Sequence, residues 1–116
     1  VIYRAVDYIR KNYMKKITLE DVAAHVYLSP AYFSKVFSEE MGCSFNAYLN
    51  RVRIETSKKL LLDDSISLVD ISGMVGYEDQ SYFSRVFKKV TGISPGKYRE
   101  SRGRRDKLKD KLAEIK

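Results

Sequence analysis

The feature that most constrains the fold of this 116-residue chain is an internal repeat. Residues 32–48 (YFSKVFSEEMGCSFNAY) align without gaps with residues 82–98 (YFSRVFKKVTGISPGKY), and eight of the 17 positions are identical. Upstream, the apolar positions of 19–26 match those of 68–75 at an offset of 49, so one residue is inserted between the two blocks. Two copies are too few for a solenoid, and we interpret the chain as a duplicated unit.

Each copy is predicted to be two short helices joined by a tight turn, because its apolar residues recur at helical spacing. In the first copy Thr18 is a good N-cap for the first helix, and Ser29-Pro30 begins the second. Gly42 fits the left-handed position that ends this second helix, and Gly92 does the same in the second copy. The pattern therefore predicts two helix-turn-helix units.

Further helices are predicted outside the repeat. Residues 44–62 contain no Gly or Pro and are expected to form one long helix of about 18 residues, or about 27 Å. Residues 1–13 are expected to form an opening helix, and Ser94-Pro95 begins one more. The expected fold class is all-α, with two helix-turn-helix subdomains joined by a long central helix.

We expect three segments along the chain. Residues 1–52 hold the first subdomain and the start of the long helix, and residues 53–101 hold the rest of that helix and the second subdomain. Residues 102–116 are a basic tail, with apolar residues at helical spacing, and the sequence leaves open whether the tail is a helix.

The charge of the chain favours a polyanionic partner. The net charge is +7 and the pI is about 9.5, but residues 102–116 alone carry +4 of that charge. Residues 80–99 contain five Lys or Arg and no acid, so the excess also reaches the main body. A single Cys and a single His exclude an internal disulfide and a multi-Cys or His-pair metal site, and no apolar run approaches the length of a membrane span.

In the second helix of each helix-turn-helix unit, the predicted core residues indicate which of the other residues face outward. A core stripe is predicted at Phe33, Val36, Phe37 and Met41, and in the second copy at Phe83, Val86, Phe87 and Val90. The opposite faces carry short or hydrogen-bonding side chains around one long cation, as a helix that enters the major groove requires. These outward residues are Ala31, Lys35 and Ser38 in the first copy and Ser81, Arg85 and Lys88 in the second, with Gln80 at its start.

These residues belong to a longer pattern. The segment VGYEDQSYFSRVFKKVTGISPGKYR (75–99) resembles the C-terminal signature of the AraC/XylS-type bacterial transcription regulators, and LSPAYFSKVF (28–37) is similar to the N-terminal half of their DNA-binding domain. The resemblance, which covers about residues 1–101, implies a fold of about seven helices and sequence-specific binding to double-stranded promoter DNA. It also implies recruitment of RNA polymerase in the bacterial cytoplasm, at the nucleoid, with no cofactor and no catalytic or metal-binding residue. A sensor or receiver domain N-terminal to this segment is expected, and the pattern is especially like the response-regulator branch.

Carried over by position, the resemblance assigns recognition helices to about 30–41 and 80–91. Base contacts fall on Ala31, Ser34, Lys35, Gln80, Ser81, Ser84 and Arg85, and phosphate contacts on Tyr32, Tyr82, Lys88 and Lys89. The chain departs from the family pattern at Ser57 and Ser72, where the family usually has Ala, and in the tail, which has no counterpart.

Two copies on either side of a helix of about 27 Å lead to a geometric hypothesis, that their outer faces lie near 34 Å apart, one turn of B-DNA. One chain would then read two successive major grooves. A helical protein-interaction domain with a solubilising basic tail is the alternative. An enzyme lacks support, because His25, Cys43 and Asp63-Asp64 have no recognisable catalytic partner.

Overall fold

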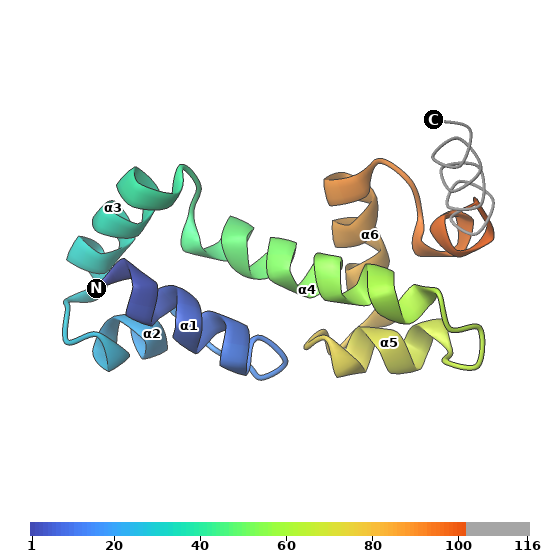
Figure 1. Ribbon diagram of the computed structural model, residues 1–116, viewed down its shortest axis with the longest axis horizontal. Helices are drawn as coiled ribbons and strands as arrows, with labels where there is room; N and C mark the ends of the chain where they lie inside the picture. The colour runs from blue at the N-terminus through green and yellow to red at the C-terminus, as the bar shows by residue number, and fades with distance from the viewer. Residues whose placement is uncertain (102–116) are drawn as a thin grey trace, which may run out of the picture. The chain divides into compact units, whose positions relative to one another are not determined.

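Every regular element in residues 1–101, the part of the chain that the computed structural model describes, is an α-helix. The predicted tail, 102–116, lies outside the described residues. Six helices follow one another along the chain, and residues 95–101 are helical as well, which makes seven in the described region and confirms the all-α class. The six are α1 (Ile2–Asn12), α2 (Leu19–His25), α3 (Pro30–Met41), α4 (Phe45–Leu61), α5 (Leu68–Met74) and α6 (Gln80–Thr91) (Figure 1).

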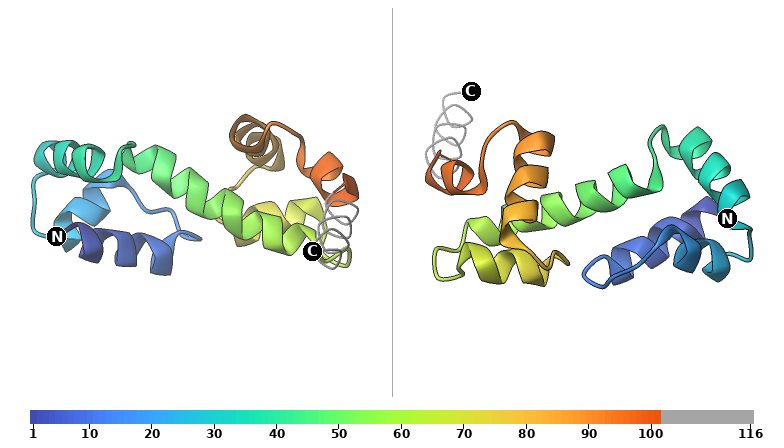
Figure 2. Two further views of the ribbon diagram at one scale, coloured as in Figure 1. Left: turned by 45° about the horizontal axis from the view of Figure 1, so that its top comes forward. Right: turned by 180° about the vertical axis from the view of Figure 1, so that it is seen from behind.

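The chain divides into two compact units, Val1–Arg53 and a second that begins at Ile54. The first contains α1, α2, α3 and the start of α4, and the second contains the end of α4 with α5, α6 and the helical segment 95–101. In each unit the second helix of the pair crosses the first steeply, as α6 crosses α5 in Figures 1 and 2. Each unit therefore contains one helix-turn-helix.

Local signals in the sequence fix the helix ends. At the start of α2, the Thr18 hydroxyl accepts the Asp21 N–H at 3.1 Å and the Asp21 carboxylate accepts the Thr18 N–H at 2.9 Å, which is a complete capping box. Ser29 caps α3, with Pro30 at its first position. Gly42 ends α3 at a φ of 74° and Gly92 ends α6 at 92°, so both adopt the left-handed conformation that the sequence predicts.

The core of each unit is built on the repeated aromatic residues. In the first unit the Phe33 and Phe37 rings lie 5.5 Å apart between centroids, and the Phe37 and Tyr48 rings lie 5.8 Å apart. In the second unit the equivalent distances are 5.8 Å for Phe83–Phe87 and 5.4 Å for Phe87–Tyr98. The contacts thus recur at the repeat offset of 50. All four Phe side chains are fully buried, and a change of such a side chain to Ala costs about 3–5 kcal/mol of stability.

One predicted core position is wrong. Val90 is 45% exposed, whereas Phe83 and Phe87 are fully buried and Val86 is 9% exposed. The repeat pairs Val90 with Glu40, which is also exposed, and pairs Thr91 with the half-buried Met41. The apolar stripe of α6 therefore continues to position 91, where the Thr91 hydroxyl lies 2.8 Å from the Phe87 carbonyl oxygen, and Val90 points away from the core.

An arginine from later in the chain binds the end of the helix that precedes each helix-turn-helix pair, α1 before α2–α3 and α4 before α5–α6. Arg53 donates to the carbonyls of Tyr13 (2.8 Å) and Lys15 (2.9 Å), just beyond the end of α1. Arg99 donates to the carbonyls of Leu61 (3.0 Å), Asp63 (3.1 Å) and Ile66 (2.6 Å), around the end of α4. Both arginines therefore bind carbonyl groups at a helix end and in the turn that follows it, where the last carbonyls of a helix have no partner within the helix.

The turn after α4 is held by side chains of its own. The Asp63 carboxylate accepts the Ser65 hydroxyl at 2.6 Å and the Ser65 N–H at 3.0 Å. These two hydrogen bonds, helped by the positive charge of Arg99, lower the pKa of the Asp63 carboxyl below its ordinary value of 3.8. The long helix predicted over 44–62 is confirmed within one residue at each end, since α4 spans Phe45–Leu61.

The two serines that stand where the family usually has Ala are both buried. Ser57 is fully buried and Ser72 is 3% exposed. Each hydroxyl donates at 2.7 Å to the carbonyl three residues back, that of Ile54 and that of Val69. The hydrogen bond satisfies the one polar group that Ser adds, so the tight packing is kept.

Candidate nucleic-acid interface

The outer face of α3 is set by the residues that the helix buries. Phe33 and Phe37 are fully buried and Val36 is half-buried, so these three residues mark the inward side of the helix. Ala31, Ser34 and Lys35 are spaced i, i+3 and i+4 and therefore share one face, and all three are exposed. Ser29 fixes the entry into the helix by accepting the Tyr32 N–H at 3.3 Å. The sequence prediction for this face is consistent with the observed exposure.

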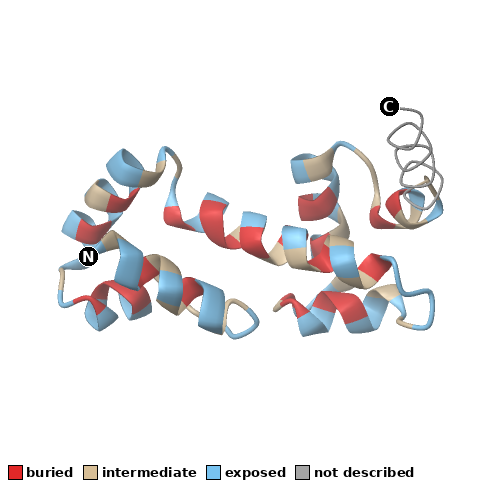
Figure 3. Cartoon of the chain, in the orientation of Figure 1, coloured by how far each residue is buried: buried red, intermediate tan, exposed pale blue. Residues whose placement is uncertain are grey.

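The outer face of α6 repeats this arrangement. Ser81, Ser84 and Arg85 have the same i, i+3, i+4 spacing, and Ser81 and Arg85 are exposed while Ser84 is half-buried. Gln80, at the first position of the helix, is half-buried as well. The cap is Asp79, whose carboxylate accepts the Ser81 N–H at 2.8 Å. Figure 3 shows buried and exposed positions alternating along both helices.

The predicted phosphate-contacting residues all lie at the surface. Tyr32 is 57% exposed and Tyr82 is 47% exposed, and Lys88 and Lys89 are exposed as well. The Tyr82 ring packs edge-on against that of the buried Tyr77, with 5.8 Å between centroids, while about half of the residue stays exposed.

The structure adds a contact that organises the second face. The guanidinium carbon of Arg85 lies 5.7 Å from the centroid of the Tyr82 ring, within the range of a cation–π interaction. Because Tyr82 is itself held by Tyr77, Arg85 stands on a supported aromatic surface. An arginine on such a support loses less side-chain entropy when it binds a partner. The i, i+3 spacing of Tyr82 and Arg85 is the sequence signal for this contact.

Two residues have roles that sequence reasoning did not anticipate. Arg99 belongs to the acid-free stretch of 80–99, yet its guanidinium binds carbonyl groups at the end of α4 rather than pointing outward. Tyr27, in the turn between α2 and α3, has a φ of 61° and a side chain that is 84% exposed. The repeat pairs Tyr27 with Gly76, which has a φ of 106°, so the alignment of the two copies contains the signal for this conformation.

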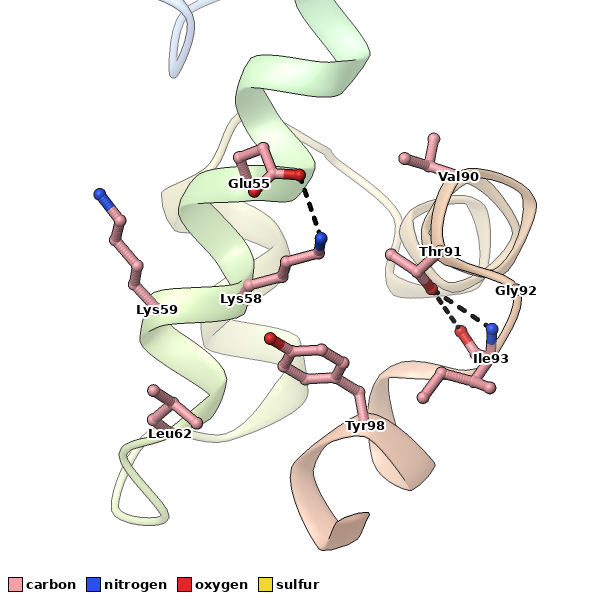
Figure 4. A pocket seen from close by; sticks show the side chains of 9 residues that line it. All are labelled: Glu55, Lys58, Lys59, Leu62, Val90, Thr91, Gly92, Ile93 and Tyr98. Carbon is pink, nitrogen blue, oxygen red and sulfur yellow. Dashed lines mark hydrogen bonds and ion pairs between the residues drawn. The ribbon is translucent and has the colours of Figure 1, made fainter. Parts of the chain in front are cut away.

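A hollow of about 630 Å³ lies in the second unit, between the end of α4, the end of α6 and the helical segment 95–101 (Figure 4). Two pairs of its polar groups contact each other. Lys58 Nζ lies 3.0 Å from a carboxylate oxygen of Glu55, and the Thr91 hydroxyl lies 3.0 Å from the Ile93 carbonyl oxygen. The exposed Val90 lines this hollow. It is separate from the outer face of α6 that carries Arg85.

Two kinds of site are absent from residues 1–101. No helix there combines the length and the apolar character that a membrane crossing requires. The same residues contain no group of three or more His, Cys, Asp or Glu side chains placed to hold a metal ion.

Comparison with known proteins identifies this arrangement. A model of the helix-turn-helix domain family matches residues 22–101. The regulatory protein PocR of Salmonella typhimurium is 40% identical over 97 residues, which are 84% of this chain and 32% of that protein. The lactose operon transcription activator of Staphylococcus xylosus is 42% identical over 98 residues, 84% of this chain and 35% of that protein. The chain thus spans about a third of the length of these relatives.

A solved structure is similar to this chain in both sequence and fold. The C-terminal domain of AraT, a response regulator from Geobacillus stearothermophilus, is 40% identical, with a TM-score of 0.83 over 86% of this chain and 84% of that one. The duplicated helix-turn-helix, the signature at 75–99 and these matches lead to one conclusion. The chain belongs to the AraC-type helix-turn-helix family, the DNA-binding domains of transcription regulators.

Proposed function

We propose that this domain binds double-stranded DNA sequence-specifically by placing α3 and α6 in the major groove. The observation that carries the proposal is the outer face of α6, where Ser81 and Arg85 are exposed opposite the fully buried Phe83 and Phe87. The buried side fixes the helix on its unit, and the exposed side offers donors of the kind that read base edges. Membership of the AraC-type family supports the same function.

Base reading in this proposal depends on the chemistry of each side chain. Arg85 donates two parallel hydrogen bonds to the O6 and N7 of a guanine, and Gln80 suits the N6 and N7 of an adenine. Ser81 and Ser84 are short enough to let the helix approach closely. On α3 the same role falls to Ala31, Ser34 and Lys35, of which only Lys35 is long.

Phosphate contacts in this proposal fix the position of each helix on the duplex. Lys88 and Lys89 supply charge, and the hydroxyls of Tyr32 and Tyr82 donate hydrogen bonds. The free N–H groups at the first turns of α3 and α6 attract phosphate oxygens as well. These contacts carry no sequence information, and they make binding depend on salt.

We further propose that one chain occupies two successive major grooves. A helix of 17 residues is about 25 Å long, shorter than the roughly 34 Å between successive major grooves on one side of B-DNA, so the segments on either side of α4 would make up the difference. The helix α4 follows α3, begins in the first unit and ends in the second, where α5 precedes α6, so both helices of the proposal belong to one continuous chain. A single chain would then grip the duplex without dimerising.

The function of the whole protein is a further proposal. The relatives that this chain matches include a transcription activator and a response regulator, and the chain spans about a third of the length of the curated ones. We propose that this domain acts within a longer bacterial regulator, with an N-terminal sensor or receiver domain, and recruits RNA polymerase at promoters on the cytoplasmic nucleoid. No catalytic role is proposed for the described residues.

Binding to duplexes selected from a random pool, measured by fluorescence anisotropy at several salt concentrations, tests this function. Arg85→Ala should weaken specific binding by about 1–3 kcal/mol and relax the preference at one base pair. Lys88→Ala should weaken binding to every duplex alike and reduce the slope of log K against log salt by about 0.9.

These measurements distinguish a base contact from a phosphate contact at each of the two residues. Equal losses on all sequences after Arg85→Ala would make that residue a phosphate contact. A wild-type domain that binds no duplex at physiological salt would overturn the proposed function and favour a protein-interaction domain.

A further inference from the structure

The two reading helices are copies of one another, but their charges differ. The helix α3 carries Lys35, Glu39 and Glu40, for a net charge of −1. The helix α6 carries Arg85, Lys88 and Lys89, for a net charge of +3. All six side chains are exposed, so the difference lies entirely on the surface.

The difference is concentrated next to the reading residue. Position 39 in the first copy corresponds to position 89 in the second, and each lies one turn beyond the long cation of its helix. The neighbour of Lys35 is therefore Glu39, whereas the neighbour of Arg85 is Lys89. Among residues 1–101, none forms an ion pair with Glu39 or Lys89, so no neighbouring charge of this region neutralises either one, and salt screens both.

The reading residues differ in the same direction. Arg85 has a planar guanidinium with five donors and is supported by the Tyr82 ring at 5.7 Å. Lys35 is a compact ammonium on a flexible chain and gives less directional hydrogen bonding. At the first reading position the second copy has Ser81, which can hydrogen-bond, whereas Ala31 can offer only a methyl contact, such as one to the methyl group of a thymine.

From these differences we infer that the two halves contribute unequally to the DNA complex, an inference that rests on the proposed function. The α6 half supplies most of the salt-dependent affinity and reads a strongly specified block that contains a guanine under Arg85. The α3 half reads a weaker block, richer in A·T pairs, and Glu39 reduces its attraction to the phosphate backbone. The binding site on DNA is therefore asymmetric, although the protein unit is duplicated.

A charge exchange between the copies tests the inference. Glu39→Lys gives α3 the charge that α6 has at the equivalent position. It should tighten binding to all duplexes several-fold and steepen the salt slope by about 0.9, the value of one added phosphate contact. The reciprocal Lys89→Glu should weaken binding and make the slope shallower. Asp7→Lys, on the exposed face of α1, changes the net charge as much as Glu39→Lys and serves as the control; it also removes the exposed Asp7–Lys11 ion pair, which contributes little to stability.

The two DNA blocks are tested separately. With a duplex taken from the selection, Arg85→Ala identifies the block under α6 as the one where base preference relaxes. Scrambling that block should reduce affinity at least tenfold more than scrambling the other, since each lost base pair contact is worth about 1–3 kcal/mol.

Each result has one meaning. Equal losses from the two blocks, or a greater loss from the block under α3, would overturn the inference. A Glu39→Lys variant that binds no better than Asp7→Lys would also overturn it. In both cases the wild-type domain still binds the selected duplex, so the proposed function survives; if the wild type does not bind it, the proposed function itself fails.

Discussion

At the scale of single residues, Tyr27 has a conformation that its own chemistry disfavours. Its φ of 61° brings Cβ close to the backbone, which costs a non-glycine residue about 1–2 kcal/mol. Its side chain is 84% exposed, so core burial does not offset that cost. At the equivalent turn the second copy has Gly76, which adopts a φ of 106° with no Cβ to crowd.

Tyr27→Gly should therefore stabilise the domain, by about 0.5–1 kcal/mol after the larger entropy of an unfolded glycine is subtracted. The free energy of unfolding from urea denaturation measures the effect. Gly76→Ala is the matched control and should destabilise by about 1 kcal/mol, because it adds a Cβ at a positive φ. A Tyr27→Gly domain less stable than the wild type would show that the tyrosine makes a stabilising contact.

Most residue placements that depend on local periodicity can be predicted from the sequence. The prediction is wrong where one copy of the repeat is considered without the other. Arg85 was placed outward because Phe83 and Phe87 had to be inside. Val90 was placed inside, although the repeat pairs it with Glu40, and the structure leaves it 45% exposed. The conformation of Tyr27 was missed for the same reason, since only the comparison with Gly76 reveals it.

At the scale of elements, arginines from later in the chain hold the ends of earlier helices. Arg99 donates to three carbonyls between Leu61 and Ile66, and Arg53 donates to two carbonyls after α1. Arg53 lies in α4 and holds the end of α1, on either side of the α2–α3 pair. Arg99 lies in the segment 95–101 and holds the end of α4, on either side of the α5–α6 pair. The unit that contains α3 and the unit that contains α6 are thus held together by the same kind of contact, an arginine bound to carbonyl groups after a helix end.

Arg99→Met should lower the free energy of unfolding by about 2 kcal/mol, because charge-assisted hydrogen bonds to the carbonyls are lost while the apolar stem is kept. Lys97→Met, two residues away and exposed, should change it by less than about 0.5 kcal/mol. Urea denaturation followed by circular dichroism measures both. Equal effects of the two changes would contradict the role given to Arg99.

Local signals determined the elements, and distant contacts could not be predicted from them. The bounds of α3 and α6 match the predicted 30–41 and 80–91, since Ser29, Pro30 and the two terminal glycines act within a few residues. The contacts of Arg53 and Arg99 span 33 to 40 residues, and no local pattern marks their partners. The charge count of residues 80–99 therefore includes Arg99, although its guanidinium binds carbonyl groups of the fold.

At the scale of the whole molecule, duplication gives the chain two copies of one helix-turn-helix core, each with one outward-facing helix, α3 or α6. The packing is preserved between the copies, as the Phe33–Phe37 and Phe83–Phe87 ring distances of 5.5 and 5.8 Å show. The surface has diverged, most clearly at Glu39 and Lys89. The same core therefore carries two faces of different charge, for which we propose different roles on DNA.

The central claim, that a single chain reads duplex DNA at two places through α3 and α6, is tested most directly by selection of bound duplexes from a random pool, with the stoichiometry of the selected complex measured in parallel. The expected motif has two informative blocks with centres about ten base pairs apart, bound by one chain. One block alone, or a palindrome bound by two chains, would contradict the claim.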